Sequence, residues 1–126
     1  GPFDGVPAAL PALMLADELQ RKAGKLGFVW GERDQAVAKV REELDEVLDA
    51  GPDEVGDELG DLLLAVVGLA RHLDVDAETA LRSASTAFRG RFERVLSKVR
   101  AADRDPAALS PGDWLALWDE VKAAGW

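Results

Sequence analysis

The chain has no cysteine and no tyrosine, and only one histidine, His72, among its 126 residues. Without cysteine it can form neither disulfides nor thiolate metal sites, and a single histidine excludes zinc sites built from several histidines. Phenylalanine occurs four times, and alternating runs of β-branched and aromatic residues are missing, so strand signals are weak. These absences favour an all-α protein.

Basic residues are also few, with 15 Lys and Arg against 24 Asp and Glu, which gives a formal net charge of −9. An acidic chain repels a phosphate backbone, so general nucleic-acid binding is disfavoured. The longest apolar run, Leu62–Ala70, has nine residues, whereas a helix needs roughly 20 to cross a bilayer. The start of the chain shows no secretory signal pattern. We therefore expect a cytoplasmic protein that binds neither nucleic acid nor membrane.

The length fits a single all-α domain over residues 3–126, because a chain this short seldom builds two cores. Gly1-Pro2, which lacks an initiating Met, is typical of a protease-cleavage remnant. Helical periodicity with capping signals predicts five helices. They span about 8–23, ended by Gly24; 34–50, capped by Asp34; 53–73; 76–102, capped by Asp76; and 110–124, capped by Ser110. Between the first two helices, we expect a loop over 26–31 that turns Phe28 and Trp30 inward.

The predicted helix over 53–73 carries the clearest apolar stripe of the chain. The stripe consists of Val55, Leu59, Leu62, Val66, Leu69 and Leu73, at the spacing of a helical-bundle seam. Leu63, Leu64 and Val67 lie off this seam, so the helix is apolar on every side between 62 and 70 and has to be covered on every side. We expect a second chain to cover part of it; a helix buried within one chain is the alternative.

Two pairs of acidic residues flank the Gly51-Pro52 break, Glu43 with Glu46 and Glu58 with Asp61. Residues three apart share one helix face, and each pair adjoins the apolar seam, so an antiparallel hairpin would let the pairs face each other. Two carboxylates about 5 Å apart repel by roughly 3 kcal/mol at an effective dielectric constant of 20. Either their pKa values rise or hard divalent cations bind.

Ligands made only of oxygen suit Mg²⁺, with Mn²⁺ as a possible substitute, and Mg²⁺ typically completes its coordination with substrate phosphates. The pattern therefore favours metal-assisted chemistry on a polyphosphate. In so acidic a chain, one such pair also arises by chance on a solvated face. Chance explains two pairs on adjacent helices less easily. Ala65, Gly68 and His72 continue the acidic line at helical spacing. Small residues there leave room for a ligand, or they simply permit close helix packing.

The segments Glu42-Glu43-Leu44-Asp45-Glu46 and Glu58-Leu59-Gly60-Asp61 resemble the E-E-x-x-E and E-x-x-D motifs of the MazG family of nucleoside triphosphate pyrophosphohydrolases. Four further segments agree in the same order, 26–30, 69–73, 88–94 and 118–122, so the resemblance covers about 11–122. It is closest to the C-terminal of the two domains in longer MazG proteins. The resemblance implies an all-α helical bundle with a four-helix core completed by dimerisation or by higher oligomerisation.

The resemblance also implies Mg²⁺-dependent cleavage of a nucleoside triphosphate (NTP) or its deoxy form (dNTP) between the α and β phosphates, as in the housecleaning of nucleotide pools. The implied metal ligands are Glu43, Glu46, Glu58 and Asp61, with Glu43 or Glu46 accepting a proton from the attacking water. The implied nucleotide-binding residues are Glu42 as a supporting acid, Arg91 and Lys122 on phosphate, and Trp118 stacked on base or sugar.

Two residues depart from the family pattern. Ala87 stands where a lysine is usual, and Gly68 stands where asparagine is common. They motivate an alternative function, a catalytically weak or inactive helical module that binds nucleotide or metal. A related all-α enzyme acting on phosphoribosyl-ATP is a third possibility, against which Trp118 and Lys122 favour the MazG-like function. Without the resemblance, Trp118 is read as core packing and Arg91 as a surface ion pair.

Overall fold

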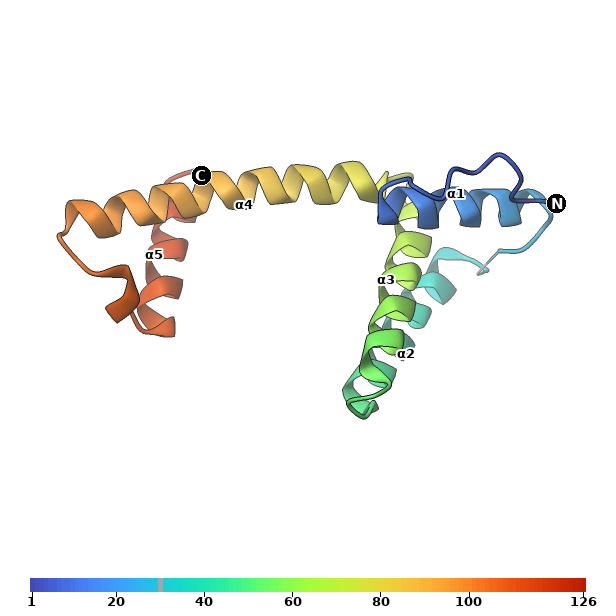
Figure 1. The fold of residues 1–126 in the computed structure, drawn as a ribbon, viewed down its shortest axis with the longest axis horizontal. Coiled ribbons are helices and arrows are strands. Elements are labelled where there is room, and N and C mark those ends of the chain that lie inside the picture. The colour runs from blue at the N-terminus through green and yellow to red at the C-terminus, as the bar shows by residue number, and fades with distance from the viewer. Residues whose placement is uncertain (30) are drawn as a thin grey trace. The chain divides into compact units, whose positions relative to one another are not determined.

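The structure, a computed structural model, describes residues 1–29 and 31–126 (Figure 1). Its elements are α1 (Ala12–Lys25), α2 (Arg33–Asp49), α3 (Val55–His72), α4 (Ala77–Ala101), the short 3-10 helix η1 (Pro106–Ala108) and α5 (Pro111–Ala123). The described residues contain no strand, which confirms the all-α class. Nowhere in these residues is a helix both long and apolar enough to span a membrane.

The chain divides into two compact units, Gly1–Ala80 and Leu81–Trp126. The first unit holds α1, α2 and α3, and the second holds most of α4 together with η1 and α5. A single domain over 3–126 stays a prediction.

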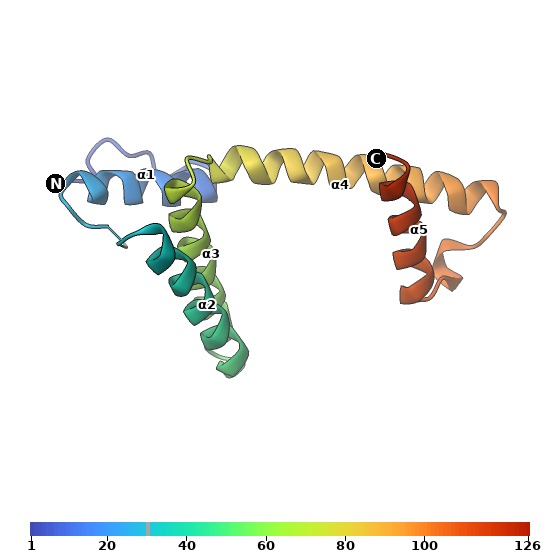
Figure 2. The same cartoon turned by 180° about the vertical axis from the view of Figure 1, so that it is seen from behind.

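In the first unit, α2 and α3 run side by side as a hairpin that turns at Gly51-Pro52, as Figures 1 and 2 show from opposite sides. Helix α1 packs against α3, where the Gln20 side-chain nitrogen donates to the Leu64 carbonyl at 2.9 Å. Ala36, Ala65 and Val67 are buried in this unit. The predicted antiparallel hairpin is therefore confirmed, and it positions the acidic pairs.

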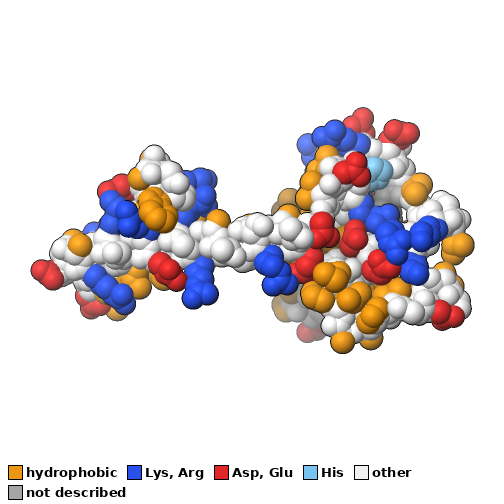
Figure 3. Space-filling model, turned by 90° about the horizontal axis from the view of Figure 1, so that it is seen from above, with side chains coloured by type: hydrophobic (Ala, Val, Ile, Leu, Met, Phe, Trp, Pro, Cys, Tyr) orange, Lys and Arg blue, Asp and Glu red, His pale blue; other side chains and the backbone are white. Residues whose placement is uncertain are grey.

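Helices α1 and α2 cover only part of α3. Its large side chains that remain more than a third exposed are Val55, Leu59, Leu63, Leu64 and Val66. Figure 3 shows hydrophobic side chains beside acidic ones on the surface of the first unit, at the right of the view. Since apolar side chains on α3 reach solvent, this helix is not buried within its own unit.

The ends of α1 and α2 differ from their predicted positions. Helix α1 begins after Pro11 and runs through Gly24 to Lys25. The residue with left-handed backbone conformation after this helix is Gly27, with φ +94°. Helix α2 is capped by Glu32 rather than Asp34, because the backbone N–H of Glu32 donates to the Gln35 side chain in a capping box. The prediction that Phe28 turns inward is wrong, since Phe28 is 61% exposed. Trp30 lies outside the described residues.

The starts of α4 and α5 are confirmed. Asp76 accepts the Thr79 backbone N–H at 3.1 Å, and hydrogen bonds from the side chain and then the backbone of Thr79 lower the pKa of Asp76. Ser110 and Asp113 exchange hydrogen bonds in a capping box, at 3.1 Å to the Ser110 hydroxyl and 3.0 Å to the Asp113 carboxylate. Helix starts are thus well predicted where a short side chain caps the backbone.

The core of the second unit consists of Val95, Val99 and Val121, against which Leu109, Trp114, Leu117 and Trp118 pack. Lys98 forms an ion pair with Glu120 at 2.7 Å and ties α4 to α5. Val95 and Val99 are buried, whereas Leu81 and Phe88 on the same helix are more than half exposed.

Replacing Ser110 with alanine is expected to lower the free energy of unfolding by about 1 kcal/mol, the usual contribution of a serine N-cap. The loss arises because the Asp113 N–H would lose its acceptor. Denaturant titration followed by circular dichroism measures the difference, with Ser97→Ala on the exposed face of α4 as the control. Equal stability of Ser110→Ala and the unmodified chain would contradict the assigned cap.

Candidate metal and nucleotide site

The structure brings together three of the four acids predicted to bind metal. Glu43 on α2 and Glu58 and Asp61 on α3 each offer one oxygen, and these oxygens all lie within 4.8 Å of one another. Glu43 is only 8% exposed, although it is charged. We call these three residues the acid cluster.

Glu46 stands outside the acid cluster and is solvent-exposed. Its charge nevertheless reaches the cluster, because it contributes to the raised pKa of Glu58. Desolvation is the largest cause of that raised pKa, followed by repulsion from Glu46, Asp61 and Glu43. Converging carboxylates therefore make proton or cation uptake favourable here, as the spacing predicted.

The chemistry of these donors fits a hard divalent cation. All the ligand atoms of the cluster are carboxylate oxygens, which suit Mg²⁺ or Mn²⁺ rather than Zn²⁺. A cation would relieve the repulsion that raises the pKa of Glu58. The acid cluster can therefore hold a metal.

Lys39 is a residue of this site that the sequence analysis missed. Its ammonium nitrogen lies 2.9 Å from a Glu43 oxygen and 3.6 Å from a Glu42 oxygen. The hydrogen bond to Glu43 is the largest cause of the raised pKa of Lys39. The available signal was its position four residues before Glu43, which places both on one helix face.

A cleft of about 240 Å³ opens beside the acid cluster, lined by Lys39, Glu43, Asp61, Leu64 and Ala65. A larger pocket of about 330 Å³ lies between α1 and α3, and Gly68 and His72 are among its lining residues. The small-residue line predicted from the sequence thus borders cavities.

The remaining predicted residues, Arg91, Trp118 and Lys122, belong to the second unit. The Arg91 guanidinium carbon lies 5.6 Å from the centre of the Trp118 ring, and its Nε donates to the Trp126 carbonyl. The Trp118 ring tilts against Phe88 at 5.3 Å and packs on the valine core. Lys122 is exposed in the last turn of α5. The structure therefore gives Trp118 a packing role and brings Arg91 next to it.

A family model described as phosphoribosyl-ATP pyrophosphohydrolase matches residues 18–88, which include the acid cluster and Glu46. The chain is 38% identical over 126 aligned positions to the nucleoside triphosphate pyrophosphohydrolase of Escherichia coli strain K12, covering 95% of this chain and 48% of that protein. It is 41% identical over 87 positions to the nucleoside triphosphate pyrophosphohydrolase/pyrophosphatase MazG of Thermotoga maritima, covering 68% of this chain and 34% of that protein.

The chain thus spans about half the length of the E. coli relative and about a third of the T. maritima one. The family match covers more than half of the chain and includes the whole α2–α3 hairpin. The chain therefore belongs to the phosphoribosyl-ATP pyrophosphohydrolase family, as a domain homologous to the MazG-type nucleoside triphosphate pyrophosphohydrolases that its acidic motifs resemble.

Proposed function

We propose that the chain is a Mg²⁺-dependent nucleoside triphosphate pyrophosphohydrolase domain. It cleaves an NTP or dNTP between the α and β phosphates and releases nucleoside monophosphate and pyrophosphate, which serves the housecleaning of nucleotide pools. The acid cluster of Glu43, Glu58 and Asp61 carries this proposal, since its oxygens converge within the segment that the family model matches. The activity named for the E. coli and T. maritima relatives supports it.

Glu43, Glu58 and Asp61 would hold Mg²⁺, and Glu46 lies close enough to repel Glu58 and to act as a fourth acid. Bound Mg²⁺ supplies positive charge to the phosphate oxygens and makes an attacking water more acidic. Mn²⁺ is expected to substitute, because it accepts the same oxygen ligands. Lys39 neutralises Glu43 in the structure and leaves a cation on the cleft wall.

Glu46 is the better placed of the two candidate bases. Glu43 is buried and paired with Lys39, whereas Glu46 is exposed and has no ion pair among the described residues. In the proposed step, a water oxygen bonds to the α-phosphorus while Glu46 takes its proton. The bond from the α-phosphorus to the bridging oxygen breaks, and its electron pair leaves with pyrophosphate.

The nucleotide roles of the other residues follow from the resemblance and remain part of the proposal. Glu42 supports the acids, Arg91 and Lys122 meet phosphate, and Trp118 stacks on sugar or base. Trp118 and Lys122 are four residues apart on α5, hence on one face. Arg91, Lys122 and the bound cations supply the positive charge that lets a triphosphate approach a chain of net charge −9.

We further propose that a second copy of the chain covers the exposed face of α3. Leu59, Leu63 and Val66 follow one another at helical spacing and are all 41–49% exposed. An apolar stripe of this kind is typical of a helix that packs against another helix. A homodimer with a four-helix core would remove it from water.

Phosphoribosyl-ATP is the second candidate substrate, because the matching family model bears that description. It too would present a triphosphate to the acid cluster. The two functions differ in the substrate that gives the higher kcat/KM.

Incubation with a panel of NTPs, dNTPs and phosphoribosyl-ATP in the presence of Mg²⁺ tests the proposal, with products identified by ³¹P NMR. We expect monophosphate with pyrophosphate, and a rate about a hundredfold lower for Glu46→Gln, the size typical of a lost general base. Glu54→Gln, at the N-cap of α3 in the same hairpin, is the matched control.

Orthophosphate with diphosphate as products would overturn the proposed cleavage position. Full activity of Glu46→Gln would remove Glu46 from the mechanism. Thermal stabilisation by Mg²⁺ and nucleotide without any turnover would instead support the non-catalytic module.

A further inference from the structure

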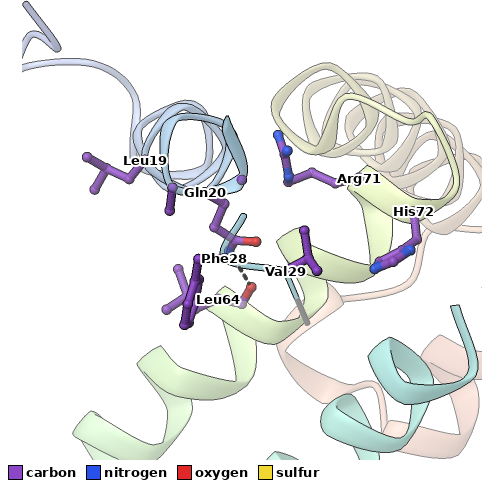
Figure 4. A pocket seen from close by; sticks show the side chains of 10 residues that line it. Leu19, Gln20, Phe28, Val29, Leu64, Arg71 and His72 are labelled. Atoms are coloured by element: carbon purple, nitrogen blue, oxygen red, sulfur yellow. Dashed lines mark hydrogen bonds between the residues drawn. The ribbon is translucent and has the colours of Figure 1, made fainter. Parts of the chain in front are cut away.

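The pocket between α1 and α3 differs in chemistry from the cleft at the acid cluster. Its walls include Leu19, Ala23 and Leu64, and its polar side chains are Gln20, Arg71 and His72. Figure 4 shows Gln20, Leu64, Arg71 and His72 around one space, with Phe28 and Val29 from the loop that follows α1. No aspartate or glutamate is among the described residues that line it, so these residues do not repel an electron-rich ring. An apolar pocket of about 330 Å³ with a few polar groups is typical of a small-molecule site.

Gln20 in this pocket has an unmet hydrogen-bonding capacity. Its Nε2 donates to the Leu64 carbonyl at 2.9 Å, the dashed line in Figure 4. Its Oε1 is shut off from solvent and has no hydrogen-bond partner within residues 1–29 and 31–126. Buried polar atoms of folded proteins nearly always have a partner. The pocket therefore suits an occupant that donates a hydrogen bond to this oxygen.

The pocket continues from the acid cluster along α3. Leu64 lines both the pocket and the cleft, and it follows Asp61 by one helical turn. Gly68 and Asp61 are seven residues apart, about 10 Å along the helix axis. A nucleotide whose phosphates meet the acid cluster therefore has its base within reach of the pocket.

We infer that this pocket takes the nucleobase of the triphosphate, and that Gln20 is a base-binding residue whose Oε1 accepts an N–H from the base edge. This inference rests on the proposed function, since it takes the phosphates to lie at the acid cluster. The apolar walls favour a flat heterocycle over water. Every common nucleobase presents such an N–H, so the pocket distinguishes a nucleotide from a triphosphate without a base.

Filling the pocket tests the inference. For Ala23→Leu we expect the KM for an NTP to rise about tenfold, because the larger side chain fills part of the apolar pocket. The kcat of this variant should stay within about twofold of that of the unmodified chain. Gln20→Met, which keeps the shape and loses the amide, should raise the same KM by about tenfold. Neither variant should change kcat/KM for ribose 5-triphosphate, which has no base. Ala38→Leu, on an exposed part of α2, is the control.

Equal losses for the NTP and for ribose 5-triphosphate, or no loss for either, would overturn the base pocket. If the unmodified chain hydrolyses nothing, calorimetry with adenosine, cytidine, guanosine and uridine replaces kinetics. If nucleosides bind the unmodified chain and the Glu58→Gln variant but not the Ala23→Leu variant, the base pocket is supported although the proposed function fails. Absence of nucleoside binding in an inactive chain contradicts the pocket as well.

Discussion

Glu58→Gln is expected to lower kcat/KM for nucleoside triphosphates by about a thousandfold, the size of losing a group that stabilises developing charge. Glu58 supplies one of the three converging oxygens, and glutamine keeps the shape but removes the charge that attracts a cation. Steady-state kinetics at saturating Mg²⁺ measures the loss.

The same substitution is expected to stabilise the metal-free protein. Desolvation and the charges of Glu46, Asp61 and Glu43 raise the pKa of Glu58 above that of an ordinary glutamate. The folded chain therefore binds this proton more tightly than the unfolded chain does. The resulting stability is fully present below the unfolded pKa and is lost as pH rises through the folded pKa. Glutamine carries no charge in the folded or the unfolded chain, so the Glu58→Gln variant does not lose this stability as the pH rises.

Thermal unfolding in chelator, followed from acidic to neutral pH, measures the effect. The melting temperature of Glu58→Gln should exceed that of the unmodified chain at neutral pH and approach it at acidic pH. Mg²⁺ should raise the melting temperature of the unmodified chain and leave that of Glu58→Gln nearly unchanged. Glu54→Gln, a charge near Glu58 but outside the acid cluster, is the control. Equal Mg²⁺ stabilisation of both variants would mean that the ion binds elsewhere.

Leu63→Glu is expected to separate the proposed homodimer. Leu63 is 49% exposed and lies between the exposed Leu59 and Val66 on α3. Burying a carboxylate there without a partner should weaken self-association by at least about a hundredfold, because an unpaired buried charge costs several kcal/mol. Light scattering should then report the 13.5 kDa of one chain instead of twice that mass.

Leu115→Glu, at a position 61% exposed on α5, is the matched control and should leave the mass unchanged. Circular dichroism of Leu63→Glu distinguishes dissociation from unfolding, since the separated chain should keep its helical signal. A monomeric mass for the unmodified chain at every concentration would refute the homodimer. It would mean that α3 is covered within one chain or remains exposed.

The fold and most of the metal site follow from local patterns. Asp76 and Ser110 are read as caps because a capping side chain reaches only two or three residues along the chain. Glu43, Glu58 and Asp61 could be grouped because helical spacing and one tight turn determine which faces meet. The error at Asp34 arose because Glu32 and Gln35 form a competing capping box two residues earlier.

The sequence by itself determined the helices, the hairpin and the convergence of its acids, since these depend on periodicity and on neighbours a few residues apart. Only the tertiary structure decided that Phe28 stays largely exposed and that Gln20 has a buried oxygen without a partner among the described residues. Gln20 and Leu64 are 44 positions apart, and no local pattern relates them. Hydrogen bonding and pKa values depend on distances in space, and these exist only once α1 has packed against α3.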